Sequence, residues 1–188
     1  MSIDLEKYKN KVVVIFASCA DLLHPGHFAA LKQGKDAARA LCKQGEEPYL
    51  IFLLQSDPTL DRPEKNKPIE ALVEREARVD ACAYVDERIN YTTEATLRDT
   101  LHALAPIIRL RILGDEYKGK EFTGHELNVP VVWIDRSHGW STSGLRQRIW
   151  RAEETVRQAK VEAARRADDQ PRGLFRFLFP PNPGSARA

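Results

Sequence analysis

The sequence predicts an α/β fold built on an open parallel sheet with helices on both faces. Two runs, residues 11–18 and 48–56, are almost continuously apolar and rich in β-branched residues, as strands buried on both faces are. Segments in which apolar residues recur at helical spacing alternate with such runs along the chain. Strands that alternate with helices pair in parallel through right-handed crossovers.

Five strands are expected. "KVVVIFAS" and "PYLIFLLQS" are the first two, a short third lies within "YVDERIN", the fourth, "RLRILGD", ends in Gly-Asp, and "PVVWIDR" is the fifth. The first, second, fourth and fifth strands cover residues 11–18, 48–56, 109–115 and 130–136, and the short third strand lies within 84–90. The resulting fold class is a Rossmann-like open five-stranded sheet.

Four helices are expected between and after these strands. The first begins at Pro25, a residue type that the first helical turn accepts. The third has Thr93 as its predicted N-cap. Polar residues rich in proline and lysine predict a mobile loop over 57–68. The helices are expected from residue 25 to about 41 and over 69–85, 93–104 and 141–169.

The length of 188 residues suits a single domain with a full-sized core. We expect this domain over 1–150, a highly charged helical extension over 151–169, and a flexible tail over 170–188 that is rich in proline, glycine and arginine. The tail contains "LFRFLF", which is apolar enough to dock on a surface or a partner.

Composition excludes several function classes. The chain has 29 Lys and Arg against 27 Asp and Glu, so its charge offers no electrostatic case for nucleic-acid binding. No apolar run approaches the ~20 residues of a membrane span, and the N-terminus has no signal-peptide pattern. The 3 cysteines lack CxxC spacing, which disfavours a disulfide framework or a zinc knuckle. We therefore expect a cytoplasmic protein.

The most informative short segment is "HPGH", in which His24 and His27 bracket Pro25 and Gly26. It follows the first strand, so it is expected at the edge of the sheet where open α/β folds bind ligands. The free N–H groups and dipole of a helix start favour an anion, and glycine allows close approach. Two imidazoles there suit a phosphoryl group that gains charge. Structural histidines and a zinc site are the alternatives, although no third ligand stands at zinc spacing.

Several segments together resemble a known family. The match extends in order and spacing over about residues 12–150 and comprises "SCADLLHPGHFAAL", "YVDERINY", "ILGDEYKGKEF" and "DRSHGWSTSGLRQRI". These segments are similar to the cytidylyltransferase-like nucleotidyltransferases, with the glycerol-3-phosphate and ethanolamine-phosphate cytidylyltransferases as the nearest members. Serine replaces the usual first glycine of the opening motif, at Ser18. Ala83 stands where the glycerol-3-phosphate enzymes carry arginine, and Tyr117 replaces a tryptophan.

The resemblance implies transfer of a nucleoside monophosphate, CMP from CTP, to a small phosphorylated alcohol or sugar with release of pyrophosphate. It implies Mg²⁺ on the triphosphate, in-line attack without a covalent enzyme intermediate, and a homodimer. An adenylyltransferase that uses ATP and a nucleotide-binding module without turnover are the alternatives. A metal-dependent hydrolase is disfavoured, because the sequence lacks the metal-binding residues that such an enzyme needs.

The resemblance also implies roles for individual residues. Catalytic roles fall on His24, His27, Lys67 (or its neighbour Lys65) and Arg136. Nucleotide-binding roles fall on Ser18, Cys19, Gly26, Gly114, Asp115, Ser141, Thr142 and Ser143. Acceptor-binding roles fall on Asp21, Arg75 and Trp140, of which Asp21 is also a candidate for contact with Mg²⁺. The structural alternatives are a solvated loop for the lysines, surface ion pairing for Arg75, helix capping for the hydroxyls and core packing for Trp140.

Overall fold

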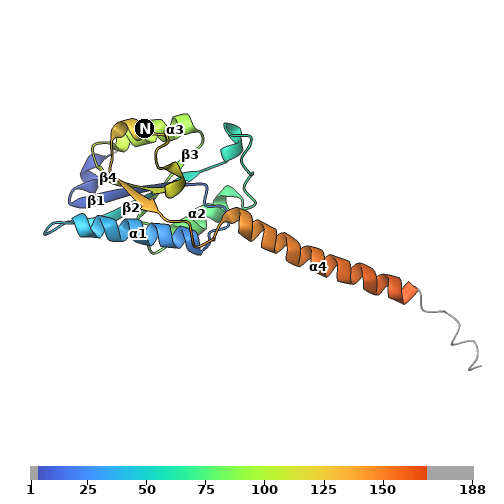
Figure 1. The fold of residues 1–188 in the computed structure, drawn as a ribbon. Coiled ribbons are helices and arrows are strands. Elements are labelled where there is room, and N and C mark those ends of the chain that lie inside the picture. Colours follow the sequence, from blue (N-terminus) through green and yellow to red (C-terminus); the bar gives the residue numbers. More distant parts are fainter. Residues whose placement is uncertain (1–3, 169–188) are drawn as a thin grey trace, which may run out of the picture. The chain divides into compact units, whose positions relative to one another are not determined.

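The protein folds around a five-stranded sheet with the strand order β3-β2-β1-β4-β5, seen in a computed structural model that describes residues 4–168 (Figure 1). All neighbouring strands pair in parallel. The strands are β1 (Lys11–Ser18), β2 (Glu47–Gln55), β3 (Glu87–Tyr91), β4 (Ile108–Gly114) and β5 (Val131–Ile134). The predicted fold class is confirmed.

Helices cover both faces of the sheet (Figure 1). They are α1 (Pro25–Leu41), α2 (Leu72–Asp80) and α3 (Glu94–Leu104), and a fourth helix, α4 (Thr142–Asp168), follows β5. One hydrophobic core joins Leu31 of α1 and Val79 of α2 to one face of the central strands. A second core joins Leu97 and Leu101 of α3 to the opposite face. Because both faces are buried, the central strands are apolar at nearly every position.

The strand order places a topological switch point between β1 and β4. The chain runs outward from β1 to β2 and β3, and then returns to build β4 and β5 on the other side of β1. Connections diverge in opposite directions beyond the carboxyl ends of β1 and β4, and an open α/β sheet offers a crevice at such a point. His24 and His27 follow β1 and therefore lie at this edge.

Helix α2 and strand β5 are shorter than the sequence predicts, and the short strand β3 begins in the middle of its predicted segment. Helix α2 spans Leu72–Asp80 rather than 69–85, because the backbone at 69–70 hydrogen-bonds to a side chain from another segment. Strand β3 begins at Glu87, since the carboxylate of Asp86 instead accepts from the Leu50 N–H at 2.7 Å. Strand β5 ends at Ile134, where the Asp135 carboxylate starts a turn by accepting from the Ser137 N–H at 2.7 Å.

The chain divides into two compact units, residues 1–145 and 146–188, and the boundary lies within α4. In the second unit the helix continues to Asp168 and is almost wholly exposed. The predicted tail, 170–188, lies outside the described residues. Among the residues that the structure describes, no helix is long and apolar enough to cross a membrane.

Helix α1 packs on the sheet at a glycine. A Cβ added to Gly34 would lie 2.1 Å from Cδ1 and 2.6 Å from Cγ1 of Ile112 on β4. We predict that Gly34→Ala lowers the free energy of unfolding by about 1 kcal/mol or more, because overpacking costs ~1–3 kcal/mol and outweighs a gain in helix propensity of up to ~1 kcal/mol. Urea denaturation measures the loss. In an Ile112→Ala background the same substitution should be neutral or stabilising, and an equal loss there would contradict the packing argument.

Candidate functional site

A cavity of about 740 Å³ lies beyond the carboxyl ends of the strands. Residues from the end of β1, the start of α1, the end of β4 and the first turn of α4 line it. It brings together many of the predicted site residues, namely Ser18, Cys19, Asp21, His24, Gly26, His27, Gly114, Arg136, Trp140, Thr142 and Ser143. Lys67, Arg75, Asp115 and Ser141 do not line it.

The two motif histidines cap the start of α1 through their own rings. Nδ1 of His24 accepts from the Gly26 N–H at 3.1 Å, and Nδ1 of His27 accepts from the His24 N–H at 3.3 Å. A neutral imidazole that accepts at Nδ1 carries its proton on Nε2. The ring centroids are 4.1 Å apart. Both Nδ1 atoms are thus used as acceptors for backbone N–H groups, which directs the ring proton to the Nε2 side.

His27 is neutral near pH 7. Burial, the neighbouring His24 ring and the charge of Arg136 together lower the pKa of His27 from 6.5 to about 3. Near pH 7 this histidine is therefore an uncharged ring whose Nδ1 accepts from the His24 N–H.

The loop between β1 and α1 is held in an unusual conformation. Ala20 and Leu22 have positive φ values of 55° and 51°, which are unfavourable for residues with a Cβ. Buried Asp21 accepts from the N–H groups of Ile69 and Glu70 at 2.9 and 3.0 Å. The Glu70 carboxylate in turn accepts from the Leu22 N–H at 2.6 Å. These reciprocal bonds position the loop that carries His24.

Arg75 supports the same loop from beneath. Its side chain is almost fully buried and donates to the carbonyls of Cys19 and Gln55, each at 2.7 Å. It also donates to the carbonyls of Ser56 and Glu70. The structure thus places Arg75 behind the cavity, where it is buried among carbonyls rather than paired on the surface, and it does not line the cavity.

The three hydroxyls at the start of α4 have different contacts. Ser141 Oγ accepts from the Gly144 N–H at 3.1 Å, which is the capping role that the sequence left open. Thr142 Oγ1 donates to the Asp21 carbonyl at 3.1 Å and so joins α4 to the β1–α1 loop. Thr142 and Ser143 line the cavity.

Arg136 meets a carboxylate that the sequence analysis did not single out. Its guanidinium donates to Glu116 at 2.6 Å, and both side chains line the cavity. A Cβ on Gly114 would lie 2.0 Å from Glu116 Oε2, so glycine is needed for this side chain to fold back. Asp115, which the sequence favoured, instead begins a 3₁₀ turn.

A third imidazole, from His138, lies beside the motif. Its Cε1 would be 3.0 Å from a Cβ on Gly26, and its Nδ1 accepts from the Trp140 N–H at 3.0 Å. The two aromatic rings are stacked with centroids 4.9 Å apart. Trp140 is 44% exposed, which argues against core packing. Sequence reasoning missed His138 although it lies within the "RSHGWSTS" segment.

The loop lysines and the metal remain predictions. Lys65 and Asn66 line the cavity, so the structure favours Lys65 over Lys67 as the lysine that faces it. Among the described residues there is no group of three or more His, Cys, Asp and Glu side chains arranged to hold a metal ion. Since Oδ1 of Asp21 already accepts two N–H bonds, Mg²⁺ would have to be held mainly by a ligand's own oxygens.

The lowered pKa of His27 predicts a pH dependence of stability. Its pKa is about 3 in the folded chain and 6.5 in the unfolded chain, so the unfolded chain binds more protons between these values. Stability should be fully present above about pH 6.5 and fall as pH decreases toward 3. His27→Asn keeps an acceptor for the His24 N–H and should lose less stability over this range. Chemical denaturation at several pH values tests this, and equal losses in both proteins would contradict it.

Comparisons with known proteins agree with this geometry. A family model described as cytidylyltransferase-like matches residues 15–149. The bifunctional protein HldE of Helicobacter hepaticus is 28% identical over 149 residues, which are 79% of this chain and 28% of that protein. HldE of Campylobacter curvus is 28% identical over 146 residues, 77% of this chain and 29% of that protein. The chain thus spans less than a third of the length of these relatives.

A solved structure supports the fold. The lipopolysaccharide core biosynthesis protein from Thermoplasma volcanium superposes with a TM-score of 0.50 at 23% identity, covering 65% of this chain and 95% of that one. The family model extends from within β1 into α4 and includes both motif histidines and the residues around them. Because it covers well over half of the sequence, the chain belongs to the cytidylyltransferase-like family.

Proposed function

We propose that this protein transfers a nucleoside monophosphate, CMP from CTP, to a small phosphorylated alcohol or sugar and releases pyrophosphate. The observation that carries the proposal is the placement of His24 and His27 at the positive end of α1, where the Nδ1 atom of each ring accepts a backbone N–H bond. A helix N-terminus with added donors suits an anion that gains charge during reaction.

The reaction needs positioning more than covalent chemistry. An oxygen of the acceptor's phosphate attacks the α-phosphorus as the bond to the bridging oxygen breaks, and pyrophosphate leaves with that oxygen's electron pair. His24 and His27 donate to the non-bridging α-phosphate oxygens, whose charge grows in the transition state. Arg136 exchanges its contact with Glu116 for the triphosphate. The Ser143 hydroxyl and backbone N–H groups at the start of α4 donate to phosphate oxygens, while the Thr142 hydroxyl keeps its bond to the Asp21 carbonyl.

Magnesium is part of the proposal. Mg²⁺ offsets the charge of the triphosphate and polarises its phosphoryl oxygens. The chain's contribution is a cavity in which the motif histidines and Arg136 face the nucleotide, with the acidic Glu116 paired to Arg136.

The nucleotide is proposed to be CTP, in line with the cytidylyltransferase-like family model. ATP is the alternative, because the curated relatives described above carry the name HldE rather than that of a cytidylyltransferase. Cytosine and adenine both carry an exocyclic amino group, so discrimination between them must come from the size and shape of the base pocket. Tyr117 and Trp140 line the cavity and are the side chains of this chain that can set that size.

Substitution of either motif histidine tests the chemistry. We predict that His24→Ala and His27→Ala each lower kcat about 100-fold or more, the scale for loss of one transition-state donor. Steady-state pyrophosphate release measures the effect. His102→Ala is the control, because His102 lies outside the cavity and hydrogen-bonds to Glu126. Near-normal turnover of either folded motif variant would reject the assignment.

Nucleotide choice is tested by thermal stabilisation. CTP, ATP, UTP and GTP are each added with Mg²⁺, and the unfolding transition of the protein is followed. We expect CTP to stabilise most, by about 2.7 kcal/mol at 100 times its Kd. Greater stabilisation and turnover with ATP would transfer the assignment to an adenylyltransferase while leaving the site chemistry intact.

A further inference from the structure

The cavity has a second half that the phosphate-binding groups do not occupy. It lies beyond β2 and β3, on the face of the sheet that α3 covers, and Gln55 and Tyr91 line it at the paired ends of these strands. Arg75 donates to the carbonyls of both Cys19 and Gln55, so this half directly adjoins the loop that leads to His24. An acceptor held here would be next to the phosphoryl group that the histidines bind.

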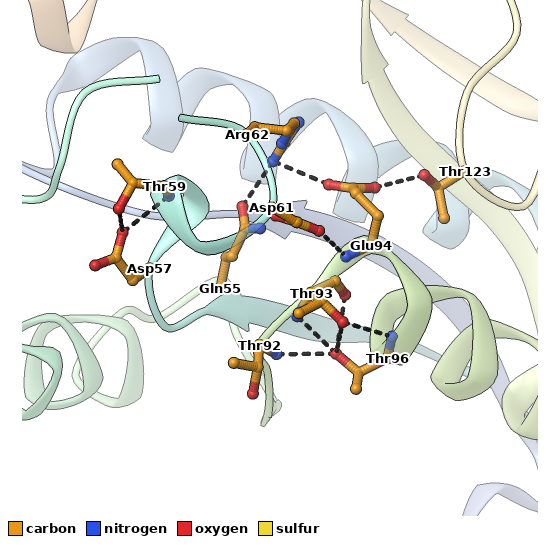
Figure 2. A network of polar contacts seen from close by, with 10 residues as sticks. All are labelled: Gln55, Asp57, Thr59, Asp61, Arg62, Thr92, Thr93, Glu94, Thr96 and Thr123. Atoms are coloured by element: carbon orange, nitrogen blue, oxygen red, sulfur yellow. Dashed lines mark hydrogen bonds and ion pairs between the residues drawn. The ribbon is translucent and has the colours of Figure 1, made fainter. Parts of the chain in front are cut away.

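Four polar side chains, Gln55, Arg62, Glu94 and Thr123, form a continuous wall of this half, which we call the polar wall (Figure 2). The Arg62 guanidinium donates to Gln55 Oε1 at 2.9 Å and pairs with Glu94 Oε1 at 2.9 Å. Thr123 Oγ1 donates to the other oxygen of Glu94 at 2.5 Å. Three separate segments of the chain thus meet at the Glu94 carboxylate.

The polar wall has buried donors that the protein does not use. Gln55 is only 2% exposed, and its Nε2 has no hydrogen-bond partner among the described residues. Contact with the Arg62 guanidinium fixes Oε1 on the side of Arg62, so the amide cannot flip to relieve Nε2. Arg62 Nε is also buried, and it too has no hydrogen-bond partner among the residues that the structure describes. Buried donors left unpaired are costly, so a ligand oxygen that accepts from them would be bound favourably.

The chemistry of the wall selects a class of ligand. It combines unused donors with carboxylate and hydroxyl oxygens that can accept further hydrogen bonds. A sugar hydroxyl both donates and accepts, and neighbouring hydroxyls do so repeatedly. An acceptor with an apolar chain would leave these polar groups unpaired, and an acceptor as small as a two-carbon amine would reach few of them.

We propose that the polar wall binds the hydroxyl groups of the acceptor, and that the acceptor is a phosphorylated sugar with several hydroxyls. This inference rests on the proposed nucleotidyl transfer. Glu94 is its central residue, because it touches both Arg62 and Thr123 and leaves lone pairs toward the cavity.

The first test is an acceptor panel. Pyrophosphate release is measured with the preferred nucleotide and mannose 1-phosphate, glucose 1-phosphate, ribose 5-phosphate, glycerol 3-phosphate or phosphoethanolamine. At least one sugar phosphate should exceed the last two acceptors in kcat/KM by about tenfold or more. The reason is that sugar hydroxyls pair the buried polar groups of the wall, whereas the two smaller acceptors leave some of them unpaired. Glycerol 3-phosphate or phosphoethanolamine as the best acceptor would overturn the proposal. So would nucleotide binding without turnover of any sugar phosphate.

The second test uses Glu94→Gln and Thr123→Val with the best sugar phosphate. Each should raise the KM for the acceptor about tenfold while the KM for the nucleotide changes less than about twofold. Glu76→Gln is the matched control, because Glu76 pairs with Arg88 at 3.0 Å outside the cavity. If the network only holds the 57–68 segment in place, both KM values and the melting temperature will change together and the proposal fails.

Failure of the two proposals can be told apart. If no triphosphate with Mg²⁺ stabilises the protein, the nucleotidyltransferase assignment itself falls. If a triphosphate binds and histidine substitution abolishes turnover of some acceptor, but the wall variants leave the acceptor KM unchanged, only the role of the wall is rejected.

Discussion

The Arg75 guanidinium, almost fully buried, donates to backbone carbonyls at Cys19, Gln55, Ser56 and Glu70. A buried charge is costly unless it is fully hydrogen-bonded, and a planar fork of five N–H donors can satisfy several carbonyls at once. The ends of β1 and β2 and the start of the α2 segment are therefore held at one geometry. The motif histidines follow the first of these segments, Gln55 ends the second, and Thr142 hydrogen-bonds to the loop after β1.

Stabilisation and function share the same atoms at the start of α1. Capping by Nδ1 of His24 and His27 satisfies backbone N–H groups that a helix start leaves free. The same bonds fix which ring nitrogen carries the proton. Since burial keeps His27 neutral, the site reaches a donor state without a change of protonation. A catalytic group that is already in its active tautomer needs little reorganisation when charge develops.

The topology separates the two substrates that the proposed reaction requires. Strand β1 lies in the middle of the sheet, with β4 and β5 on one side and β2 and β3 on the other. Arg136, Thr142 and Ser143 approach from the β5 side, whereas the polar wall stands on the β2 and β3 side. The histidines follow β1, between these halves, which is where bond exchange between a nucleotide and an acceptor would have to take place.

The sequence by itself determined the sheet, the helices and the place of the HPGH motif. Continuous apolar runs mark buried parallel strands, and a motif directly after the first of them must lie at the carboxyl edge of the sheet. Resemblance to a known family also singled out Arg136 and the hydroxyls at the start of α4.

The contacts of Glu70, Glu116, His138 and the polar wall were decided only by the tertiary structure. Gln55 and Arg62 meet Glu94 and Thr123 across long stretches of sequence. Likewise, Arg75 is a charged residue on a helix until folding buries it among carbonyls from other segments. Local patterns specify which residues form strands and helices, but a hydrogen bond between distant segments exists only once packing has brought its donor and acceptor within reach.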